Sequence, residues 1–387
     1  MRNRNGNFRQ KPQIPVLWEQ EFRRIPTAIT MVNGIQKMAS RKGYKVNLYE
    51  RCAGLLNDSP AASVIVVGSE SSRTPHILQD LKKAQWQIVV TNVDADHIDA
   101  HYSCATFSRR IITEQMLDHL LNKGCRRIAM VGLGQRSFND MVHQDAMAQY
   151  LLKYPYAEGA CFEYQNRIDE SFNAFYAMRD GFDAVLCPNA FVAVAFLHFC
   201  EEKGIVVPND LLVACMKDHS IGRYCKPSLT SLAVDFFAIG EQSVIVWQYL
   251  QEEGNERFRM RIAIQGHVIE RESTGTALGE GAQSLANDGT LDGKYEGGPF
   301  YTDPELQALM SLERCLQNCD ELDLRIIQLL LDGKHYDAIS EQLYLGDSSL
   351  QYRVRKIFHS AQTKSRDEFI RLMRNSFTRN THFGEEK

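Results

Sequence analysis

The sequence lacks the features that mark membrane proteins, exported proteins and the common enzyme classes. No apolar run reaches the roughly 18 to 20 residues that a membrane-spanning helix requires. The basic stretch of residues 1–13 is not followed by the apolar segment of a secretion signal. GxSxG, P-loop, HExxH and dinucleotide-binding GxGxxG motifs are missing, and Val131–Ser137 has two glycines but neither the third nor an acidic partner. These absences predict a cytoplasmic chain that is not an enzyme and holds no cofactor.

Cysteine is present ten times, but its spacing excludes the usual metal sites. The cysteines are scattered and lie mostly inside apolar segments, where a reduced cysteine acts as a small hydrophobic residue. Cys315 and Cys319 are one helical turn apart, with no second pair at ligand spacing. We therefore predict neither disulfides nor a metal centre.

Charge is distributed unevenly along the chain. The 48 acidic residues slightly outnumber the 44 basic ones, for a net charge of −4. Residues 348–379 reverse this balance, with Asp367 and Glu368 as the acidic residues among eight arginines and lysines. A basic C-terminal segment on an otherwise acidic chain predicts that this segment belongs to a small module that binds phosphate groups, and that the rest of the chain forms a domain with a different function.

Strand and helix patterns alternate from residue 13 to residue 275 of the 387-residue chain. Nearly continuous apolar strands such as SVIVV and AVLC, separated by helical patterns, are typical of parallel sheets covered on both faces. The alternation first runs to a strand at Arg126–Gly132, then restarts with a helix near Met147 and ends in a strand pair within residues 261–270. Two successive α/β halves predict two lobes, with ligands bound beyond the carboxyl ends of the strands.

The rest of the chain predicts a linker and a small helical domain. Residues 276–303 are rich in Gly, Asp and Ser and predict a flexible linker. Residues 304–319 place leucines at helical spacing, which fits either a helix packed on its neighbours or a helix that mediates dimerisation. In residues 320–378, short helices follow one another: Asp320 suits the cap of the first, a tight turn at 345–347 separates the second from the third, and Ser348 or Ser349 caps the third. This is a helix-turn-helix pattern. Leu350, Val354 and Ile357 of the third helix are expected to point inward. Residues 1–12 and 379–387 are predicted to be tails, the first disordered and basic.

The third of these helices has a polar, basic outer face. Gln and Arg offer paired donors to base edges, and neighbouring Arg and Lys suit phosphates, although a solvated charged helix of a bundle would look similar. The predicted DNA-binding residues are Ser348, Ser349, Gln351, Tyr352, Arg353, Arg355 and Lys356.

Residues 323–373 resemble the DNA-binding domain of LuxR-type regulators. Leu329–Gly333 matches a Leu-Leu-x-x-Gly helix end, Ile339–Leu343 an Ile-Ala-x-x-Leu pattern, and Ser349–Arg353 the Ser/Thr-Val-Lys-x-His start of the recognition helix. Gln351 and Arg353 replace the Lys and His of that pattern, so the resemblance implies no particular DNA sequence.

Residues 13–275 resemble the effector domain of LacI-type repressors, which has the periplasmic-binding-protein fold. The matching segments, in order, are Gly34-Ile35 with Gly43-Tyr44, His119–Leu121 to Ala129, Glu201–Gly204 with Val207–Asp210, Pro227–Leu232, and Arg271–Thr274. The resemblance implies a sensor of small molecules. Because a two-fold dimer matches a palindromic duplex, we also expect a homodimer. The N-terminal DNA-binding headpiece of the family has no counterpart here, and the C-terminal helix-turn-helix is expected to replace it.

The ligand-binding positions that the resemblance implies are only partly occupied by the family's residue types. Ser108 stands where a cleft aspartate is usual, His143 where an arginine is usual, and Ala190 after Asn189 where an aspartate is usual. Losing several polar ligands at once would leave the hydroxyls of a sugar unpaired. Three alternatives are therefore open: the cleft binds a sugar, it binds another small molecule such as an anion through Lys217 and Arg109, or it binds nothing. The candidate ligand-binding residues are Ser108, Arg109, His143, Asn189, Lys217 and Asp218.

These observations predict a bilobed α/β sensor domain joined to a small all-α DNA-binding domain. The partners expected are double-stranded DNA, a small-molecule effector and a second copy of the chain. The alternatives are a solute-binding protein, or a regulator that works through protein contacts and whose helix-turn-helix does not bind DNA.

Overall fold

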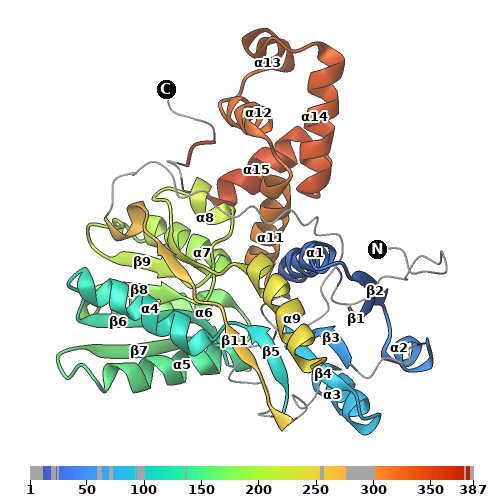
Figure 1. The fold of residues 1–387 in the computed structure, drawn as a ribbon. Coiled ribbons are helices and arrows are strands. Elements are labelled where there is room, and N and C mark those ends of the chain that lie inside the picture. The colour runs from blue at the N-terminus through green and yellow to red at the C-terminus, as the bar shows by residue number, and fades with distance from the viewer. Residues whose placement is uncertain are drawn as a thin grey trace. The chain divides into compact units, whose positions relative to one another are not determined.

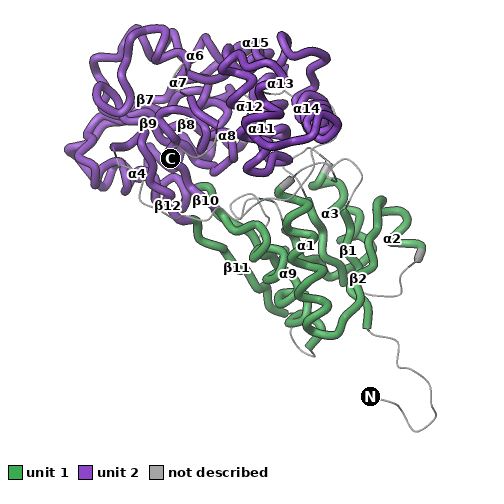
Figure 2. The backbone as a smooth tube through the Cα atoms, turned by 90° about the horizontal axis from the view of Figure 1, so that it is seen from above, with its two compact units in different colours: residues 1–109, 234–266, 285–293 green, residues 110–233, 267–284, 294–387 purple. Residues whose placement is uncertain are grey.

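The computed structural model describes residues 12–18, 23, 26–58, 63–68, 73–91, 93, 101–135, 137–252, 257–275, 300, 302–378 and 381–383. Most of the predicted linker and nearly all of the predicted N-terminal tail therefore lie outside the described residues. The chain forms two compact units, described here one at a time (Figures 1 and 2).

Unit 1 is built from residues up to Arg109 and from residues 234–266. Its sheet has the strand order β11-β5-β4-β3-β1-β2, with every pairing parallel. The central strands are buried along their length, as their unbroken apolar sequences predict. In chain order the elements are β1 (Gln13–Leu17), α1 (Pro26–Arg41), β2 (Lys45–Tyr49), α2 (Cys52–Asp58), β3 (Ser63–Val67), α3 (Arg73–Lys83), β4 (Gln87–Thr91), β5 (Ser103–Thr106), α9 (Phe236–Leu250) and β11 (Arg261–Ala263).

Helices α1 and α9 approach each other closely because glycines face the partner backbone. A Cβ atom on Gly34 would lie 2.2 Å from the carbonyl oxygen of Phe237, and one on Gly240 would lie 2.0 Å from that of Met31. No side chain fits in this space, so glycine at both positions allows two helices from distant parts of the sequence to pack together.

Unit 2 contains residues 110–233, the segment from residue 267 onward and the C-terminal helices. Its sheet has the order β12-β10-β9-β8-β6-β7, parallel except for β12, which pairs antiparallel with β10. Its α/β elements are α4 (Arg109–Asn122), β6 (Arg127–Gly134), α5 (Phe138–Leu151), β7 (Glu158–Tyr164), α6 (Ile168–Tyr176), a 3₁₀ turn (Arg179–Gly181), β8 (Ala184–Cys187), α7 (Ala190–Glu202), β9 (Leu212–Cys215), α8 (Ile221–Tyr224), β10 (Thr230–Ala233), β12 (His267–Ile269) and a 3₁₀ turn (Glu272–Thr274).

The prediction of two successive halves is wrong in its connectivity. The strand at Arg127–Gly134 belongs to unit 2, and the predicted strand pair near the end is split, with β11 in the sheet of unit 1 and β12 in that of unit 2. The short β5, missed in the sequence, fills the place between β4 and β11. The chain passes between the units more than once, because long-range strand pairing rather than sequence order decides which sheet a strand joins.

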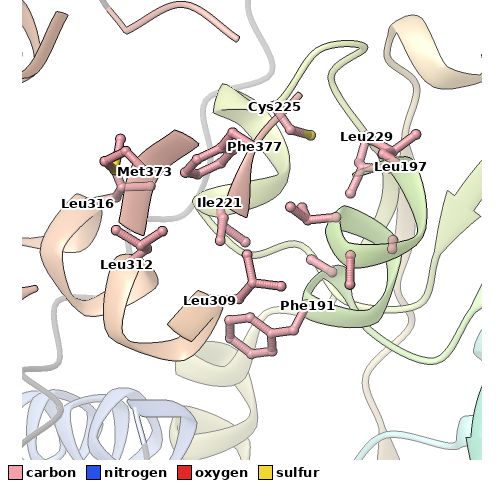
Figure 3. Close-up of a cluster of buried hydrophobic side chains, with 14 of the residues drawn as sticks. Phe191, Leu197, Ile221, Cys225, Leu229, Leu309, Leu312, Leu316, Met373 and Phe377 are labelled. Atoms are coloured by element: carbon pink, nitrogen blue, oxygen red, sulfur yellow. The ribbon is translucent and has the colours of Figure 1, made fainter. Parts of the chain in front are cut away.

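The C-terminal helices are part of unit 2. Helix α7 is apolar around its whole circumference, and its buried residues share one hydrophobic cluster with those of the C-terminal helices. Figure 3 shows Leu309 beside Phe191 and Ile221, and Leu316 beside Met373, in that cluster. These helices are α11 (Pro304–Gln317), α12 (Glu321–Leu331), α13 (Tyr336–Leu343), α14 (Asp347–Ser360) and α15 (Arg366–Ser376).

Of the two alternatives for residues 304–319, the structure shows α11 as a helix packed on its neighbours. Leu306, Leu309, Leu312, Cys315 and Leu316 are each at most 3% exposed. In the described part of the chain, α11 leaves no apolar stripe open on which a dimerising role could rest.

Candidate DNA-binding and effector-binding sites

Helices α12 to α14 form by the local signals that the sequence carries. Asp320 accepts a hydrogen bond from the backbone N–H of Asp323 and caps α12, as predicted. Helix α12 ends before Gly333, which has a φ of 79°, and α13 ends at Tyr344, with a φ of 54°. The buried face of α14 is Leu350, Val354 and Ile357, the three residues predicted to point inward.

The N-terminus of α14 lies two to three residues earlier than predicted. Gly346 is the N-cap and Asp347 the first helical residue, so Ser348 and Ser349 lie in the first turn and do not cap it. The hydroxyl of Ser340 on α13 donates to the carboxylate of Asp347 at 3.1 Å, which joins the two helices across the turn. The serines are thereby left exposed at the start of the helix.

The predicted DNA-binding residues divide into two groups. Ser348, Ser349, Gln351, Tyr352 and Arg355 are exposed, and Tyr352 retains 71% of its surface. This exposed group contains the donors and acceptors that could reach base edges and phosphates.

Arg353 and Lys356 are not free outward-pointing residues. The guanidinium of Arg353 lies 2.6 Å from Oδ1 of Asp323 and 2.9 Å from Oδ2 of Asp320, and the ammonium of Lys356 lies 2.9 Å from Oδ2 of Asp323. The Asp323 side chain is fully buried. Hydrogen bonds to Asp320 and Asp323 raise the pKa of Arg353, and the bond to Asp323 raises that of Lys356. Both basic residues hold α14 against α12, a contact that helical spacing alone did not predict.

The candidate ligand residues near the carboxyl end of β5 belong to unit 1. Ser108 and Arg109 are buried, at 6% and 4% exposure. The Arg109 guanidinium stacks over the Phe107 ring, 5.1 Å from its centroid. Phe107 in turn makes an edge contact with Phe236 at the start of α9. The arginine predicted to meet an effector is thus also an integral part of the packing of unit 1.

The other candidates lie in unit 2, beside the carboxyl ends of its strands. His143 is buried, with its Nδ1 2.7 Å from the hydroxyl of Thr113, and that hydroxyl lies 3.5 Å from the sulfur of Met216, next to Lys217. This contact brings His143 close to the segment that carries Lys217. Asn189 is the N-cap of α7, and its Oδ1 accepts a hydrogen bond from Val192.

Asp218 is engaged within the protein. Its Oδ1 lies 2.8 Å from the guanidinium of Arg271 and accepts a hydrogen bond of 2.6 Å from Ser231, and Oδ2 lies 3.6 Å from Arg223. Burial opposes ionisation, but Arg271, Ser231 and Arg223 together lower the pKa of Asp218. An aspartate bound in this way has few lone pairs left for an effector, so its place in the candidate set is weakened.

His219 was not among the predicted site residues, although it directly follows Asp218 in the same loop. Its ring packs on that of Phe191 at 4.6 Å, and burial, followed by the charge of Lys217, lowers its pKa to about 4. The imidazole is therefore neutral at physiological pH. Its Nδ1 is buried and has no hydrogen-bond partner among the described residues. The signal that could have identified His219 in the sequence is its position directly after the candidate residues Lys217 and Asp218.

Two further features concern the whole described chain. No helix among the described residues is long and apolar enough to cross a membrane. The described residues also contain no group of three or more His, Cys, Asp or Glu side chains arranged to hold a metal ion.

Comparisons with known proteins agree with this fold. A family model described as a periplasmic binding protein-like domain matches residues 117–274, ending before α11. The HTH-type transcriptional regulator GntR of Escherichia coli K12 is 25% identical over 233 residues, which are 57% of this chain and 67% of GntR. The predicted class, an α/β fold of the periplasmic-binding-protein type, is confirmed.

Several solved structures with the same fold are of transcription regulators. The probable maltose operon repressor MalR of Staphylococcus aureus has a TM-score of 0.54 at 15% identity, covering 70% of this chain and 100% of MalR. The regulator CelR in complex with cellobiose has a TM-score of 0.52 at 19% identity, covering 69% of this chain and 85% of CelR. The relatives are thus regulators rather than enzymes, and about a third of this chain lies outside the structural matches.

Proposed function

We propose that this chain is a transcription regulator that binds double-stranded DNA through α13 and α14, under the control of a small molecule held by its α/β domain. The observation that carries the proposal is the exposed face of α14. Gln351, Tyr352 and Arg355 project from a helix that Arg353 and Lys356 fasten to its neighbour. A rigid helix with exposed donors, preceded by a tight turn, is what recognition in the major groove requires.

The resemblance of residues 323–373 to LuxR-type DNA-binding domains and the regulators among the relatives support the same function. Because a two-fold dimer matches a palindromic duplex, we further propose that the chain acts as a homodimer. Sedimentation of the purified chain tests this last point, since a monomer at the concentrations that bind DNA would contradict it.

For the effector, the chemistry of the loop after β9 favours an anionic group over the paired hydroxyls of a sugar. Asp218 is occupied by arginine, and Lys217 supplies positive charge beside the neutral His219. Thermal shift assays with sugar phosphates and carboxylates, compared with neutral sugars, test this expectation. Stabilisation by the anionic compounds that Lys217→Ala abolishes would support it, and stabilisation by neutral sugars alone would contradict it.

The DNA-binding proposal is tested by selecting duplexes from a random pool with the full-length protein. We expect a palindromic motif to be enriched. Arg355→Ala should then weaken binding by about 1–3 kcal/mol if the side chain meets a base, or reduce the salt slope by about one if it meets a phosphate. Arg51→Ala removes an exposed arginine of unit 1 and is the matched control.

Arg353→Ala separates the two groups of basic residues. Because Arg353 pairs with Asp320 and Asp323, its loss should lower the stability of the helical module as well as DNA affinity. Arg355→Ala should lower affinity alone. Binding that survives the loss of both Gln351 and Arg355 unchanged would contradict the proposed role of α14.

A further inference from the structure

Glu313 is a buried carboxylate on the apolar face of α11. It is 1% exposed and lies in the helix between Leu309 and Leu316, which are also buried. Its Oε1 accepts hydrogen bonds from the backbone N–H of Ser220 at 2.9 Å and from the side-chain amide of Gln317 at 2.9 Å. Its Oε2 accepts a bond of 2.6 Å from the backbone N–H of Ile221.

Burying a carboxylate costs free energy unless donors replace its water, and here two of the donors are amides of one loop. Burial raises the pKa of Glu313, and the bonds from Ile221 and Ser220 oppose that shift. A leucine would fill the position without tying α11 to any particular backbone atom. The carboxylate therefore adds a directional connection to contacts that are otherwise hydrophobic.

The two amides directly follow the candidate effector loop. Lys217, Asp218 and His219 lie between the end of β9 and Ser220, and Ile221 opens α8. Hydrogen bonds of 2.6 and 2.9 Å do not survive a shift of about 1 Å in this backbone unless α11 moves with it.

The other side of α11 contacts the proposed DNA-binding module. The thiol of Cys315, two residues beyond Glu313, is 3.5 Å from the carbonyl oxygen of Ile357 in α14. Leu312 and Leu316 lie beside Met373 of α15 (Figure 3). One helix thus touches both the candidate effector loop and the recognition helix.

We propose that Glu313 is the coupling residue of this regulator: it transmits displacement of the loop at residues 217–220 through α11 to the DNA-binding helix α14. The inference rests on the proposed function and specifies how the site is regulated. Glu313 is a positioning residue and contacts neither effector nor DNA.

A second buried carboxylate provides the control. Asp303 caps α11 and accepts a hydrogen bond of 3.0 Å from the backbone N–H of Ile168, at the start of α6. Like Glu313, it joins α11 to the α/β part of unit 2, but it does so at α6 and not at the loop after β9. Asp303→Asn should loosen the docking of α11 without cutting the connection to that loop.

The experiment is a double-mutant cycle on the full-length chain. Asp218→Asn perturbs the loop by weakening the ion pair with Arg271. We expect it to change the dissociation constant for the duplex enriched in the selection by about threefold or more, and to raise amide hydrogen exchange in both residues 217–222 and residues 347–360. In the Glu313→Ala background, adding Asp218→Asn should raise amide hydrogen exchange in the loop alone. The dissociation constant for the duplex should then be the same as that of the Glu313→Ala single variant.

Glu313→Gln keeps the shape of the side chain and one acceptor oxygen, so it repeats the test if the alanine variant does not fold. With Asp303→Asn as background, the effect of Asp218→Asn on α14 should persist. An effect of Asp218→Asn that is the same with and without Glu313 would overturn the proposal. If the wild-type chain binds no duplex, the proposed function fails, but the exchange measurements still decide whether the loop and α14 are coupled through Glu313.

Discussion

Leu309→Ala tests whether the C-terminal helices and the α/β part of unit 2 fold as one body. Leu309 is completely buried and lies beside Phe191 and Ile221 (Figure 3). Truncating a fully buried leucine removes its transfer free energy and leaves a cavity, which together cost about 2.7–5 kcal/mol. We expect a loss of about 3 kcal/mol, near the lower end of this range.

The assay can separate the two units because the three tryptophans, Trp18, Trp86 and Trp247, all belong to unit 1. Tryptophan fluorescence during urea unfolding therefore follows unit 1, whereas far-ultraviolet circular dichroism also follows the helices of unit 2. With an m-value of about 3 kcal/mol/M, a loss of about 3 kcal/mol moves the unit 2 midpoint by about 1 M urea. The fluorescence midpoint should stay in place.

Leu152→Ala is the matched control, since Leu152 belongs to the same unit but is 81% exposed. Its effect should stay within about 0.5 kcal/mol. The reasoning is refuted if Leu309→Ala is equally mild. It is also refuted if the variant shows a separate early transition of small amplitude, because the C-terminal helices would then unfold independently of the sheet.

Three further substitutions test local features. Burial, reinforced by neighbouring carboxylates, raises the pKa of Glu305 from 4.5 to about 7, so the native state binds the extra proton and stability falls as pH rises through this window. Glu305→Gln should be more stable than wild type by about 1–3 kcal/mol at pH 8, with no advantage near pH 4.5, as measured by urea unfolding. Asp323→Asn leaves its two basic partners on α14 without their buried carboxylate and should cost about 2–3 kcal/mol in the circular dichroism transition, and a neutral result would contradict the ion-pair account. Gly240→Ala drives a methyl group into the carbonyl of Met31 and should lower the free energy of unfolding of unit 1, followed by fluorescence, by about 2–3 kcal/mol, whereas Gly54→Ala, with open space around it, should not destabilise.

Local signals account for the parts of the fold that were predicted correctly. The cap at Asp320, the glycine after α12 and the inward spacing of Leu350, Val354 and Ile357 were all visible in the sequence. Each depends on residues within one or two helical turns. The same holds for the buried strands of both sheets.

The burial of Glu313 was not predicted, although the sequence contained a signal for it. Glu313 occupies a position at helical spacing from the buried Leu306, Leu309 and Leu316, so its own burial could have been predicted from the periodicity of α11. Its partners could not, because the amides of Ser220 and Ile221 lie more than 90 residues away along the chain.

The sequence by itself determined the α/β class of the sensor domain, the helices of the C-terminal module and its excess of basic residues, because periodicity, capping and charge are properties of neighbouring residues. Tertiary structure alone decided which strands share a sheet, that α11 packs on α7 and α8, that Arg353 and Lys356 pair with Asp323, and that Asp218 is held by Arg271. These contacts join residues far apart in the chain, where side-chain geometry and burial, rather than spacing, select the partner.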